Sequence, residues 1–446
     1  MTRRKKVIIV GAGLAGLSAA VYLIKKGFFI HVVEAKPYIG GRTASWEADG
    51  MVVESGLHRF LGFYEILPRL LHQVGVQVDD VVQWVNELEI RLPNPGPSQI
   101  LTLSPLGQPV DTLRSLLGNN DFLSASEKLA LSNFMVKGLK EYFSSPASLD
   151  EVSIYEFATR EGLSQDIIKK IITPFSTGLF FLPPEGYSSY VFFGTIGPYL
   201  KRIHQLKIGA FRGGMTEVMI EPIVDFITKQ GGRVDSEREV TQLLFDGKKV
   251  RGVRLSYEEI VADEVILAAS LAGAKTIIRQ TPGLKRHFPE LLALPTMPAV
   301  TVQFELSEPS ANTDRVVFSP DTLWASYAEQ ARTTFTHLPG RLSAIMAKAD
   351  ELIYLSDSEI LEKALEDAKE ININLKTMTN YRVIRHPADF YSLSPGSEKL
   401  RPPQATSLPG LTLAGDYTKQ KYLATMEGAV DSGEKAANIL NRENTL

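Results

Sequence analysis

The most constraining feature of this sequence is a glycine-rich turn that separates two short apolar runs. Residues 7–10 read Val-Ile-Ile-Val, the motif G-x-G-x-x-G follows at residues 11–16, and residues 17–26 have the pattern of a helix. A second apolar run, residues 28–33, ends in the acid Glu34. Continuous apolar runs of this length indicate strands that are buried on both faces. The stretch therefore predicts a strand–helix–strand unit of a parallel sheet.

Each glycine of this turn has a separate physical role in such a unit. Gly11 allows the tight turn, Gly13 lets the backbone approach a pyrophosphate, and Gly16 lets the helix pack closely against the strand. The N–H groups at the start of the helix then face the phosphates. Glu34 is suited to accept hydrogen bonds from the hydroxyl groups of a ribose. We therefore predict a dinucleotide-binding site.

Length and composition limit the remaining choices. The 446 residues suffice for two domains, and a charged share of 22% is ordinary for a soluble globular protein. A formal net charge of −3 argues against a nucleic-acid binder, because no basic excess is available to neutralise phosphates. The absence of cysteine excludes disulfides, thiolate metal sites and a flavin linked through cysteine. No run approaches the ~20 apolar residues of a membrane-spanning helix, and we expect a cytoplasmic protein without a metal site.

From about residue 77 the pattern changes, which predicts a second domain inserted into the nucleotide-binding fold. Residues 78–92 contain strand-like pieces, and residues 111–206 are mostly helical. The most apolar part, residues 175–200, is rich in Phe and Tyr, and the basic residues Lys201 and Arg202 follow it directly. This part reads either as the core of a helical domain or as a greasy tunnel whose mouth meets a membrane. The residues leave both interpretations open.

The rest of the chain alternates between the two predicted domains. Residues 263–269 predict a parallel strand that rejoins the first sheet, and residues 411–416, followed by a helix, do so again. Strands at residues 300–306 and 342–347, with a helix at 358–371, belong to the second domain. We therefore predict an α/β fold, a Rossmann-like, doubly wound nucleotide-binding domain with an inserted, mixed α+β substrate domain. The predicted segments are 1–76, 207–293 and 396–446 for the nucleotide-binding domain and 77–206 and 294–395 for the substrate domain.

Further motifs extend the pattern to both ends of the chain. They are Glu34-Ala35, Gly40-Gly41-Arg42, residues 54–58, Gly213-Gly214-Met215 and the stretch LAGDYTKQKYLATMEGAV at residues 413–430. In this order they resemble the flavin-containing amine oxidoreductase superfamily. The last stretch, with Gly56-Leu57-His58, is similar to the plant and cyanobacterial type of phytoene and ζ-carotene desaturase. Residues 77–206 carry no such likeness, although they would hold much of the substrate pocket.

The resemblance implies a glutathione-reductase-type nucleotide-binding domain and a non-covalently bound FAD. It places Gly11, Gly13, Leu14, Ala15, Gly16, Gly41 and Arg42 around the pyrophosphate, Glu34 and Ala35 at the adenosine ribose, and Val240 at the adenine. It places Gly415 and Asp416 at ribityl or phosphate oxygens, Gly56, Leu57 and His58 near the flavin ring, and Met426 and Glu427 at a helix N-terminus that faces the flavin.

The activity implied by the resemblance is desaturation of a long apolar isoprenoid of the phytoene or carotenoid type. A hydride would pass from an allylic C–H to the flavin, a proton would leave the neighbouring carbon, and a quinone or oxygen would take the electrons. His58 and Tyr417 are the candidate catalytic residues, because they are the titratable groups expected nearest the ring. His58 also suits a structural, flavin-packing role, and Tyr417 suits the lining of the pocket.

Three alternatives stay open. An amine oxidase would use the same flavin site with a smaller, polar-ended pocket and release hydrogen peroxide. A redox-neutral polyene isomerase would need reduced FAD, and a lipid-binding protein of the same fold would need no flavin, although Gly415-Asp416 and Met426-Glu427 argue against it. The expected partners are an apolar small molecule, a quinone acceptor and the inner face of a membrane, contacted peripherally through residues 175–207. The sequence does not determine the substrate, the bond oxidised or the oligomeric state.

Overall fold

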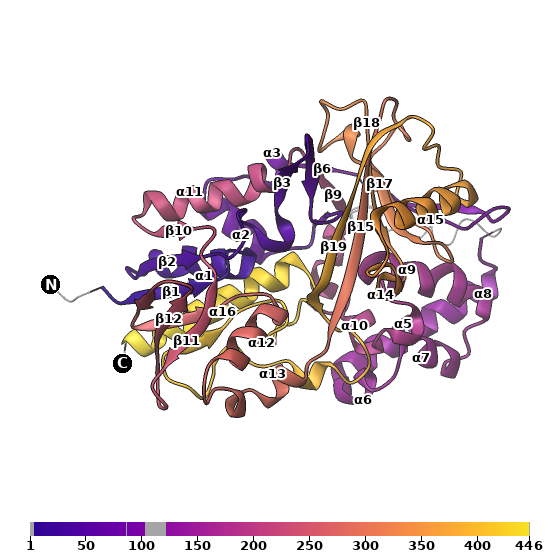
Figure 1. Ribbon diagram of the computed structural model, residues 1–446. Helices are drawn as coiled ribbons and strands as arrows, with labels where there is room; N and C mark the ends of the chain where they lie inside the picture. The colour runs from indigo at the N-terminus through magenta and orange to yellow at the C-terminus, as the bar shows by residue number, and fades with distance from the viewer. Residues whose placement is uncertain (1–3, 86, 103–121, 446) are drawn as a thin grey trace.

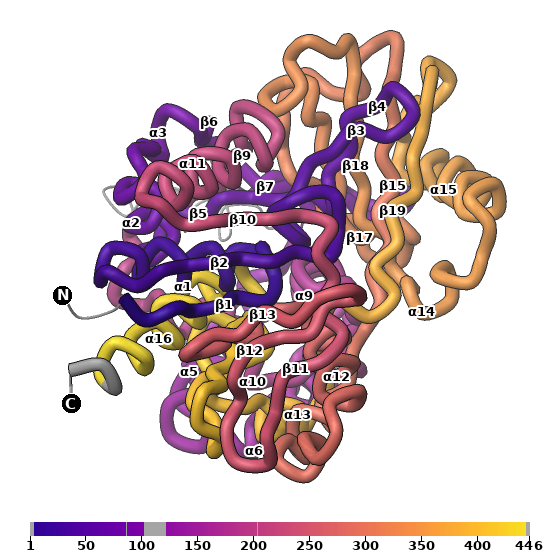
Figure 2. The backbone as a smooth tube through the Cα atoms, turned by 60° about the vertical axis from the view of Figure 1, so that its left-hand side comes forward, coloured from indigo at the N-terminus to yellow at the C-terminus, as the bar shows by residue number. Residues whose placement is uncertain are grey.

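The computed structural model describes residues 4–85, 87–102 and 122–445. In Figure 1, the part of the molecule that holds both termini consists of a sheet and helices. It stands beside a tall, mostly antiparallel sheet and a group of helices. The two termini lie close together at the same end of the molecule in Figures 1 and 2. The two ends of the chain therefore meet in one part of the structure.

The first sheet has five strands, and all neighbouring strands run parallel. In spatial order they are β10 (Arg233–Asp235), β2 (Phe29–Val33), β1 (Lys6–Val10), β14 (Glu264–Leu267) and β20 (Leu411–Leu413). The strands predicted at both ends and in the middle of the chain are thereby confirmed. The first helix, α1 (Leu14–Ile24), begins inside the glycine motif, earlier than the predicted residue 17.

Both faces of this sheet are covered, as its apolar strands require. Val7 and Ile9 of β1 belong to a core shared with α1, α11 (Glu221–Lys229) and α16 (Met426–Thr445). Ile8 and Val10 belong to a core shared with the antiparallel strands β11 (Val240–Phe245), β12 (Val250–Leu255) and β13 (Glu259–Val261). On this second face, the structure therefore differs from the predicted doubly wound arrangement, in which helices cover both faces of the sheet. Tight turns such as the one at Gly247 fold this segment into hairpins, and their apolar strands cover the sheet in place of a helix layer.

A second sheet of seven strands stands beside the first part (Figure 1). In spatial order its strands are β19 (Met378–Tyr391), β15 (Thr296–Leu306), β18 (Gly340–Met346), β17 (Trp324–Glu329), β16 (Val316–Phe318), β7 (Glu87–Arg91) and β8 (Ser98–Thr102). The strands predicted at residues 300–306 and 342–347 are confirmed, as is the helix α15 (Asp357–Glu370). The long strand β19 was not predicted, because it carries several charged residues and Pro387 and is mostly half-buried.

Short elements join these two parts. One of them is a hairpin of β3 (Ser45–Ala48) and β4 (Met51–Glu54), whose turn residues Asp49 and Gly50 have positive φ angles of 47° and 75°. A three-stranded sheet combines β5 (Phe60–Leu61), β9 (Ile208–Phe211) and β6 (Val82–Trp84). The other helical segments around the two sheets are η1 (Gly41–Thr43), α2 (Ile66–Gln73), α3 (Val78–Val81), η5 (Thr216–Ile220), α12 (Leu271–Gln280), η6 (Lys285–His287), α13 (Pro289–Ala293), η7 (Gln330–Arg332), α14 (Ala349–Leu352) and η8 (Glu398–Leu400).

The helical group in Figure 1 lies between β8 and β9 in the chain. Its helices are α5 (Ala125–Ser144), α6 (Pro146–Asp150), α7 (Ile154–Arg160), α8 (Gln165–Ile167), η2 (Ile168–Ile172), α9 (Thr173–Phe180), η3 (Pro184–Gly186), α10 (Ser189–Gly194) and η4 (Gly197–Gln205). The mostly helical character predicted for residues 111–206 holds from residue 122 on, and residues 111–121 lie outside the described residues.

Most aromatic side chains of the helical group form its core. Phe180, Tyr187, Phe192 and Phe193 are buried, and Phe193 packs against Phe134 with ring centroids 5.3 Å apart. These buried side chains agree with the helical-core interpretation of residues 175–200. None of the helices described combines the length and apolar character that crossing a bilayer demands.

Candidate functional site

A cavity of about 440 Å³ opens at the carboxyl ends of the parallel strands. Its lining includes Val10 and Val33, which end β1 and β2, and Ala268 and Gly415, which follow β14 and β20. Ligands of open α/β sheets bind at this edge. Among the described residues, the helical group contributes nothing to the lining. The cavity therefore belongs to the parallel sheet and the elements around it.

The three glycines of the first turn differ in what surrounds them. Gly11 has a φ of 105°, and a Cβ there would lie 2.7 Å from the carbonyl oxygen of Ala268. A Cβ on Gly16 would lie 2.0 Å from the carbonyl oxygen of Gly11, so this glycine allows the helix to approach the turn. Gly13 lines the cavity, and a Cβ there would meet nothing within 4 Å. Gly16 does not line the cavity, and its role is packing.

The N-terminus of α1 faces this cavity. Its N-cap residue, Gly13, provides no side-chain cap, and the first turn holds no acidic residue. Leu14 and Ala15, the first residues of the helix, line the cavity as predicted. The first N–H groups of a helix carry a partial positive charge. This end of the cavity is therefore suited to an anion such as a pyrophosphate.

Glu34 lies at the end of β2, where the sequence predicted a ribose-binding acid. One carboxylate oxygen accepts a hydrogen bond of 2.9 Å from the backbone N–H of Ala12. The other accepts one of 3.0 Å from the N–H of Lys36. These bonds fix the carboxylate at the cavity wall, which Ala35 and Val240 also line.

Arg42 and Asp416 join the two ends of the chain across the cavity wall. The guanidinium donates two hydrogen bonds, of 2.9 and 2.6 Å, to the two carboxylate oxygens. Asp416 follows β20, whereas Arg42 lies in η1 directly after Gly41, and all three residues line the cavity. The ring of Phe390 lies 4.9 Å from the Arg42 guanidinium carbon. Two-point pairing and this stacking hold the arginine in one orientation.

His58 lines the cavity, as predicted, but the two residues before it do not. Its Nδ1 lies 3.1 Å from the carbonyl oxygen of Gly56. Burial lowers the pKa of His58 to about 4, because the charged imidazolium would lose its hydration. His58 is therefore neutral near pH 7. Gly56 and Leu57 place this histidine and do not themselves line the cavity.

The other candidate catalytic residue, Tyr417, does not line the cavity. It is 1% exposed and belongs to the core, and its hydroxyl has no hydrogen-bond partner among the residues that the structure describes. Burial raises its pKa well above the usual range. Tyr417 therefore lies in the core behind the cavity wall, and its predicted pocket-lining role stays a prediction.

Glu427, predicted at the flavin, likewise does not line the cavity, whereas its neighbour Met426 does. Its buried carboxylate accepts hydrogen bonds of 2.7, 2.7 and 2.8 Å from the N–H groups of Glu65, Ile66 and Leu67. These N–H groups start α2, whose own N-cap residue makes no side-chain cap. The Glu427 side chain is therefore a cap for another helix, which no local sequence pattern reveals.

The sequence missed the cavity residues at the end of β19, namely His386, Asp389 and Phe390. His386 Nδ1 lies 3.0 Å from an Asp389 carboxylate oxygen, and Nε2 lies 2.9 Å from the carbonyl oxygen of Ser55. The hydrogen bond with His386 lowers the pKa of Asp389 to about 2. The only signal was a histidine three residues before an aspartate, a spacing too common to indicate a site.

Other lining residues also escaped prediction. They are Lys36, Gly40, Thr43, Arg238, Glu239, Ala269, Ser270, Gly273, Thr276, Ile277, Gln280, Ala424, Thr425 and Ala429. Ser270 is the N-cap of α12, so the start of this helix also reaches the cavity. Most of these residues lie in loops, and the residues beside them in the cavity lining come from distant parts of the chain.

The donor set of the cavity fits a dinucleotide. The uncapped start of α1 and the open side of Gly13 suit a pyrophosphate, and the fixed carboxylate of Glu34 suits ribose hydroxyls. Arg42 adds a permanent positive charge within the same wall. Among the described residues, no group of three or more His, Asp or Glu side chains is arranged to hold a metal ion.

Comparison with known families agrees with this geometry. Residues 14–441 match the family described as flavin containing amine oxidoreductase. Since the match covers most of the chain, the protein belongs to this family and is a flavin-dependent oxidoreductase. The resemblance predicted from the motifs is confirmed.

Within this class the chain is similar to carotenoid desaturases. It is 30% identical to the 15-cis-phytoene desaturase of an Oncidium hybrid cultivar, over 98% of this chain and 77% of the other. It is 26% identical to the 15-cis-phytoene desaturase of Synechococcus elongatus, over 99% of this chain and 97% of that one. The zeta-carotene desaturase of a Synechocystis species is 27% identical, with coverage of 98% and 97%.

A solved structure of putrescine oxidase superposes with a TM-score of 0.76 at 18% identity, covering 98% of this chain and 99% of that chain. At this identity the likeness shows the fold alone.

Proposed function

We propose that the protein binds FAD non-covalently and desaturates a long apolar isoprenoid of the carotenoid type. The observation that carries this proposal is the similarity to phytoene and zeta-carotene desaturases over nearly the whole chain. The dinucleotide-fitting cavity supports the choice of FAD, since FAD is the flavin that contains a pyrophosphate and an adenosine.

In this proposal, different parts of the cavity lining hold different parts of FAD. Gly11, Gly13, Leu14, Ala15, Gly41 and Arg42 would hold the pyrophosphate, Glu34 and Ala35 the adenosine ribose, Val240 the adenine, Gly415 and Asp416 ribityl or phosphate oxygens, and Met426 and His58 the flavin. The predicted site residues that do not line the cavity are not part of this assignment; they are Gly16, Gly56, Leu57, Tyr417 and Glu427.

FAD, when bound, supplies an acceptor for the hydride of an allylic C–H bond. The chain's own residues bind and orient the cofactor. His58 adds no charge near neutral pH, since its pKa is lowered to about 4. The proposed reaction therefore needs no strong acid or base from His58. A quinone or oxygen is the proposed electron acceptor.

The predicted division into five segments is also part of this proposal. Segments 1–76, 207–293 and 396–446 supply all strands of the parallel sheet, and segments 77–206 and 294–395 supply all strands of the seven-stranded sheet. We assign the first three to the FAD-binding domain and the other two to the substrate domain.

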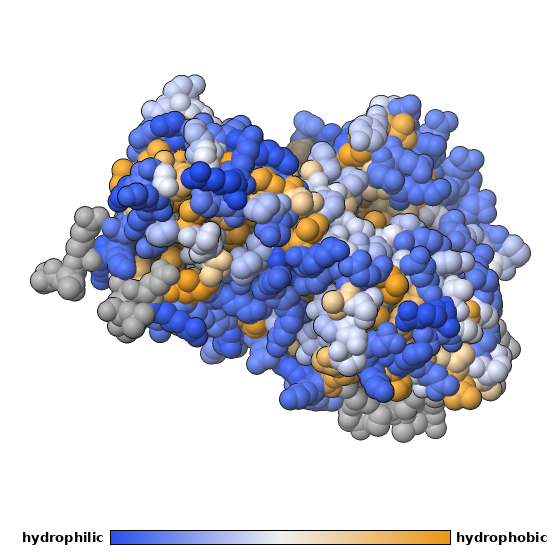
Figure 3. All heavy atoms as spheres, turned by 90° about the horizontal axis from the view of Figure 1, so that it is seen from below, coloured by the Kyte–Doolittle hydropathy of each residue, from blue (hydrophilic) through white to orange (hydrophobic). Residues whose placement is uncertain are grey.

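Peripheral contact with the inner face of a membrane completes the proposal. Leu179 and Leu200 are 38% and 39% exposed, and the exposed Lys201 follows Leu200. Figure 3 shows one face of the molecule, on which apolar side chains form several separate groups among hydrophilic ones. Co-sedimentation with anionic liposomes tests this contact, and recovery of all protein in the supernatant would refute it.

The test of the function is a visible spectrum of purified holoprotein during anaerobic additions. We expect flavin absorbance that bleaches with phytoene in detergent and returns with a quinone. Bleaching by putrescine in place of phytoene would identify an amine oxidase. Product isomers formed only with pre-reduced flavin would identify an isomerase. A colourless protein that takes up no FAD would refute the proposal.

A further inference from the structure

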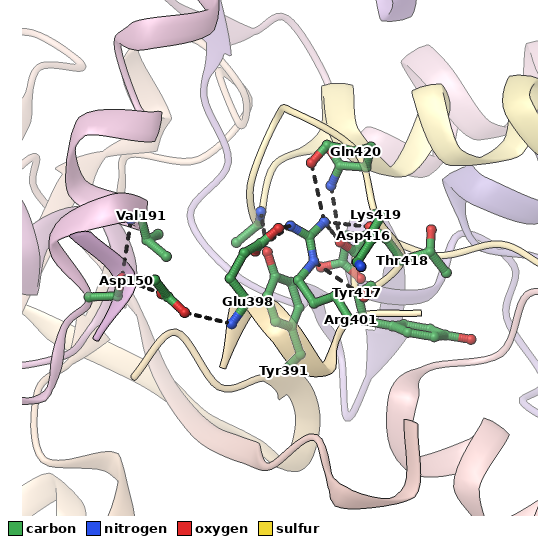
Figure 4. Close-up of polar contacts among 12 residues, drawn as sticks. Asp150, Val191, Tyr391, Glu398, Arg401, Asp416, Tyr417, Thr418, Lys419 and Gln420 are labelled. Atoms are coloured by element: carbon green, nitrogen blue, oxygen red, sulfur yellow. Dashed lines mark hydrogen bonds and ion pairs between the residues drawn. The ribbon is translucent and has the colours of Figure 1, made fainter. Parts of the chain in front are cut away.

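Arg401 is a buried arginine that holds the loop following β20. Its side chain is 0% exposed. Its Nε donates a hydrogen bond to the carbonyl oxygen of Tyr417 at 3.3 Å. One terminal nitrogen donates to three further carbonyl oxygens, those of Thr418, of Asp416 at 3.2 Å and of Gln420 at 3.4 Å. Figure 4 shows the guanidinium surrounded by this loop. One side chain thus fixes the backbone on both sides of Tyr417.

The remaining terminal nitrogen of Arg401 binds Glu398. It donates hydrogen bonds of 2.9 and 2.7 Å to the two carboxylate oxygens. The aromatic ring of Tyr391 lies 5.3 Å from the guanidinium carbon. Every nitrogen of the guanidinium therefore has a partner, and the planar group can take only one orientation.

Glu398 connects this arginine to the helical group. Its backbone N–H donates to a carboxylate oxygen of Asp150 at 3.1 Å (Figure 4). The other oxygen of Asp150 accepts from the Ser188 hydroxyl at 2.6 Å. Asp150 ends α6, and Ser188 is the N-cap of α10. The loop after β20 is thus tied to two helices that do not reach the cavity.

The loop matters because Asp416 lines the cavity. The Asp416 carboxylate pairs with Arg42 on the cavity side, whereas its carbonyl oxygen accepts from Arg401 on the core side. The position of the carboxylate therefore depends on a backbone that Arg401 holds. Gln420 also donates to the Asp416 carbonyl at 3.0 Å, and the same arginine binds the carbonyl of Gln420.

We propose that Arg401 is a positioning residue of the cofactor site: it sets the Asp416 loop for FAD, and Asp150 anchors it through Glu398. This inference rests on the proposed binding of FAD at the cavity. Lysine cannot replace the arginine, because an ammonium group lacks the planar fork that reaches carbonyls and a carboxylate together.

The test compares two buried arginines in the full-length chain. Arg341 is also 0% exposed and binds the carbonyl oxygen of Val52 at 2.6 Å, but it does not line the cavity. We expect Arg401→Lys to weaken FAD binding by about tenfold or more, equivalent to ~1.4 kcal/mol. Arg341→Lys should lower the urea midpoint of unfolding and leave the Kd for FAD unchanged. FAD titration followed by flavin fluorescence measures the Kd.

A second variant keeps the test decisive if Arg401→Lys does not fold. Asp150→Asn has the same size, but its amide can accept from only one of the two donors, Glu398 N–H or Ser188 O–H. We expect a smaller loss of FAD affinity and a changed visible spectrum of the bound flavin. Unchanged Kd and spectrum in the folded variants, or an equal loss in Arg341→Lys, would overturn the proposal. If the unsubstituted protein itself binds no FAD, the proposed function fails instead.

Discussion

At the scale of single residues, the glycines of the motif at residues 11–16 have different structural roles. Gly13 faces open space at the cavity, whereas Gly16 lies where a Cβ would touch the carbonyl oxygen of Gly11 at 2.0 Å. Arg42 and Asp416 each have two roles. Each lines the cavity, and each holds the other's side chain in place through two hydrogen bonds. Binding and stability are therefore separable by substitution at neighbouring positions.

Alanine at Gly13 should affect binding alone. Gly13 has extended backbone angles, φ −76° and ψ 175°, that alanine adopts freely. We expect Gly13→Ala to change the free energy of unfolding of the apoprotein by less than about 0.5 kcal/mol. The Kd for FAD should rise by about tenfold or more, because the new methyl group occupies the side of the pyrophosphate.

Gly16→Ala is the matched contrast, with an expected loss of stability of about 2 kcal/mol or more from overpacking. Urea unfolding and FAD titration of both variants give the two quantities. A Gly13→Ala protein that binds FAD as tightly as the original would contradict the assignment.

His58 makes the stability of the apoprotein depend on pH. Its folded pKa is lowered to about 4 from the ordinary value of 6.5, so the unfolded chain takes up the proton first as pH falls. The stabilisation is present above pH 6.5 and declines towards pH 4. Between pH 4 and 6.5, we expect His58→Gln to lower the number of protons taken up on unfolding by up to one, and so to flatten the pH dependence of the free energy of unfolding.

Urea unfolding between pH 4.5 and 7.5 measures this dependence. His337→Gln, at an exposed position, is the control. An unchanged slope in His58→Gln would show that His58 is not buried in its neutral form.

At the scale of elements, one helix completes another. The start of α2 receives its cap from Glu427 on α16, a residue far away in the chain. Similarly, β19 completes the cavity of the parallel sheet with His386 and Phe390, although it belongs to the seven-stranded sheet. Elements that look independent in the sequence therefore depend on partners for their ends and for their function.

Glu427→Ala should destabilise the protein without loosening FAD. Removal of the carboxylate leaves three N–H groups at the start of α2 without their acceptor, which we expect to cost about 2–3 kcal/mol. Since the side chain does not line the cavity, the Kd for FAD should stay within about twofold. Asn438→Ala, at an exposed position of α16, is the control for helix propensity. A large loss of FAD affinity at Glu427 would restore the predicted cofactor role.

At the scale of the whole molecule, the two ends of the chain are packed together. Helix α16, the last helix of the chain, lies against α1 (Figure 2). Gly433 makes this contact close, because a Cβ there would lie 2.2 Å from the carbonyl oxygen of Ala15. The hydroxyl of Ser18 adds a bond of 2.9 Å to the carbonyl oxygen of Val430.

Gly433→Ala should therefore destabilise the protein, against the helix propensity of alanine. In an exposed helix the change would stabilise by about 1 kcal/mol, but here the methyl group must push two helices apart, at an expected cost of about 1–3 kcal/mol. Thermal and urea unfolding of the full-length protein measure the sign. An increase in stability would show that the two helices can separate without cost.

Several elements could be predicted because their information is local. The motif around Gly11, the apolar run of β1 and the hairpin turn at Asp49 and Gly50 each combine neighbouring residues whose physics allows few conformations. The cavity residues Gly13 and Glu34 followed from such motifs, whereas Arg42 and Asp416 followed from the resemblance to the family. Strand β19 could not be predicted, because charged and half-buried residues mask its alternation.

The sequence by itself determined the class of cofactor site, since a glycine turn between two buried strands already fixes where phosphates can bind. Only the tertiary structure decided which neighbouring side chains reach that site. Met426 faces the cavity, whereas Glu427 caps α2 and Tyr417 enters the core. The physical reason is that a side chain's direction depends on what the distant chain segments around it can accept, and spacing along one strand or helix does not contain that information.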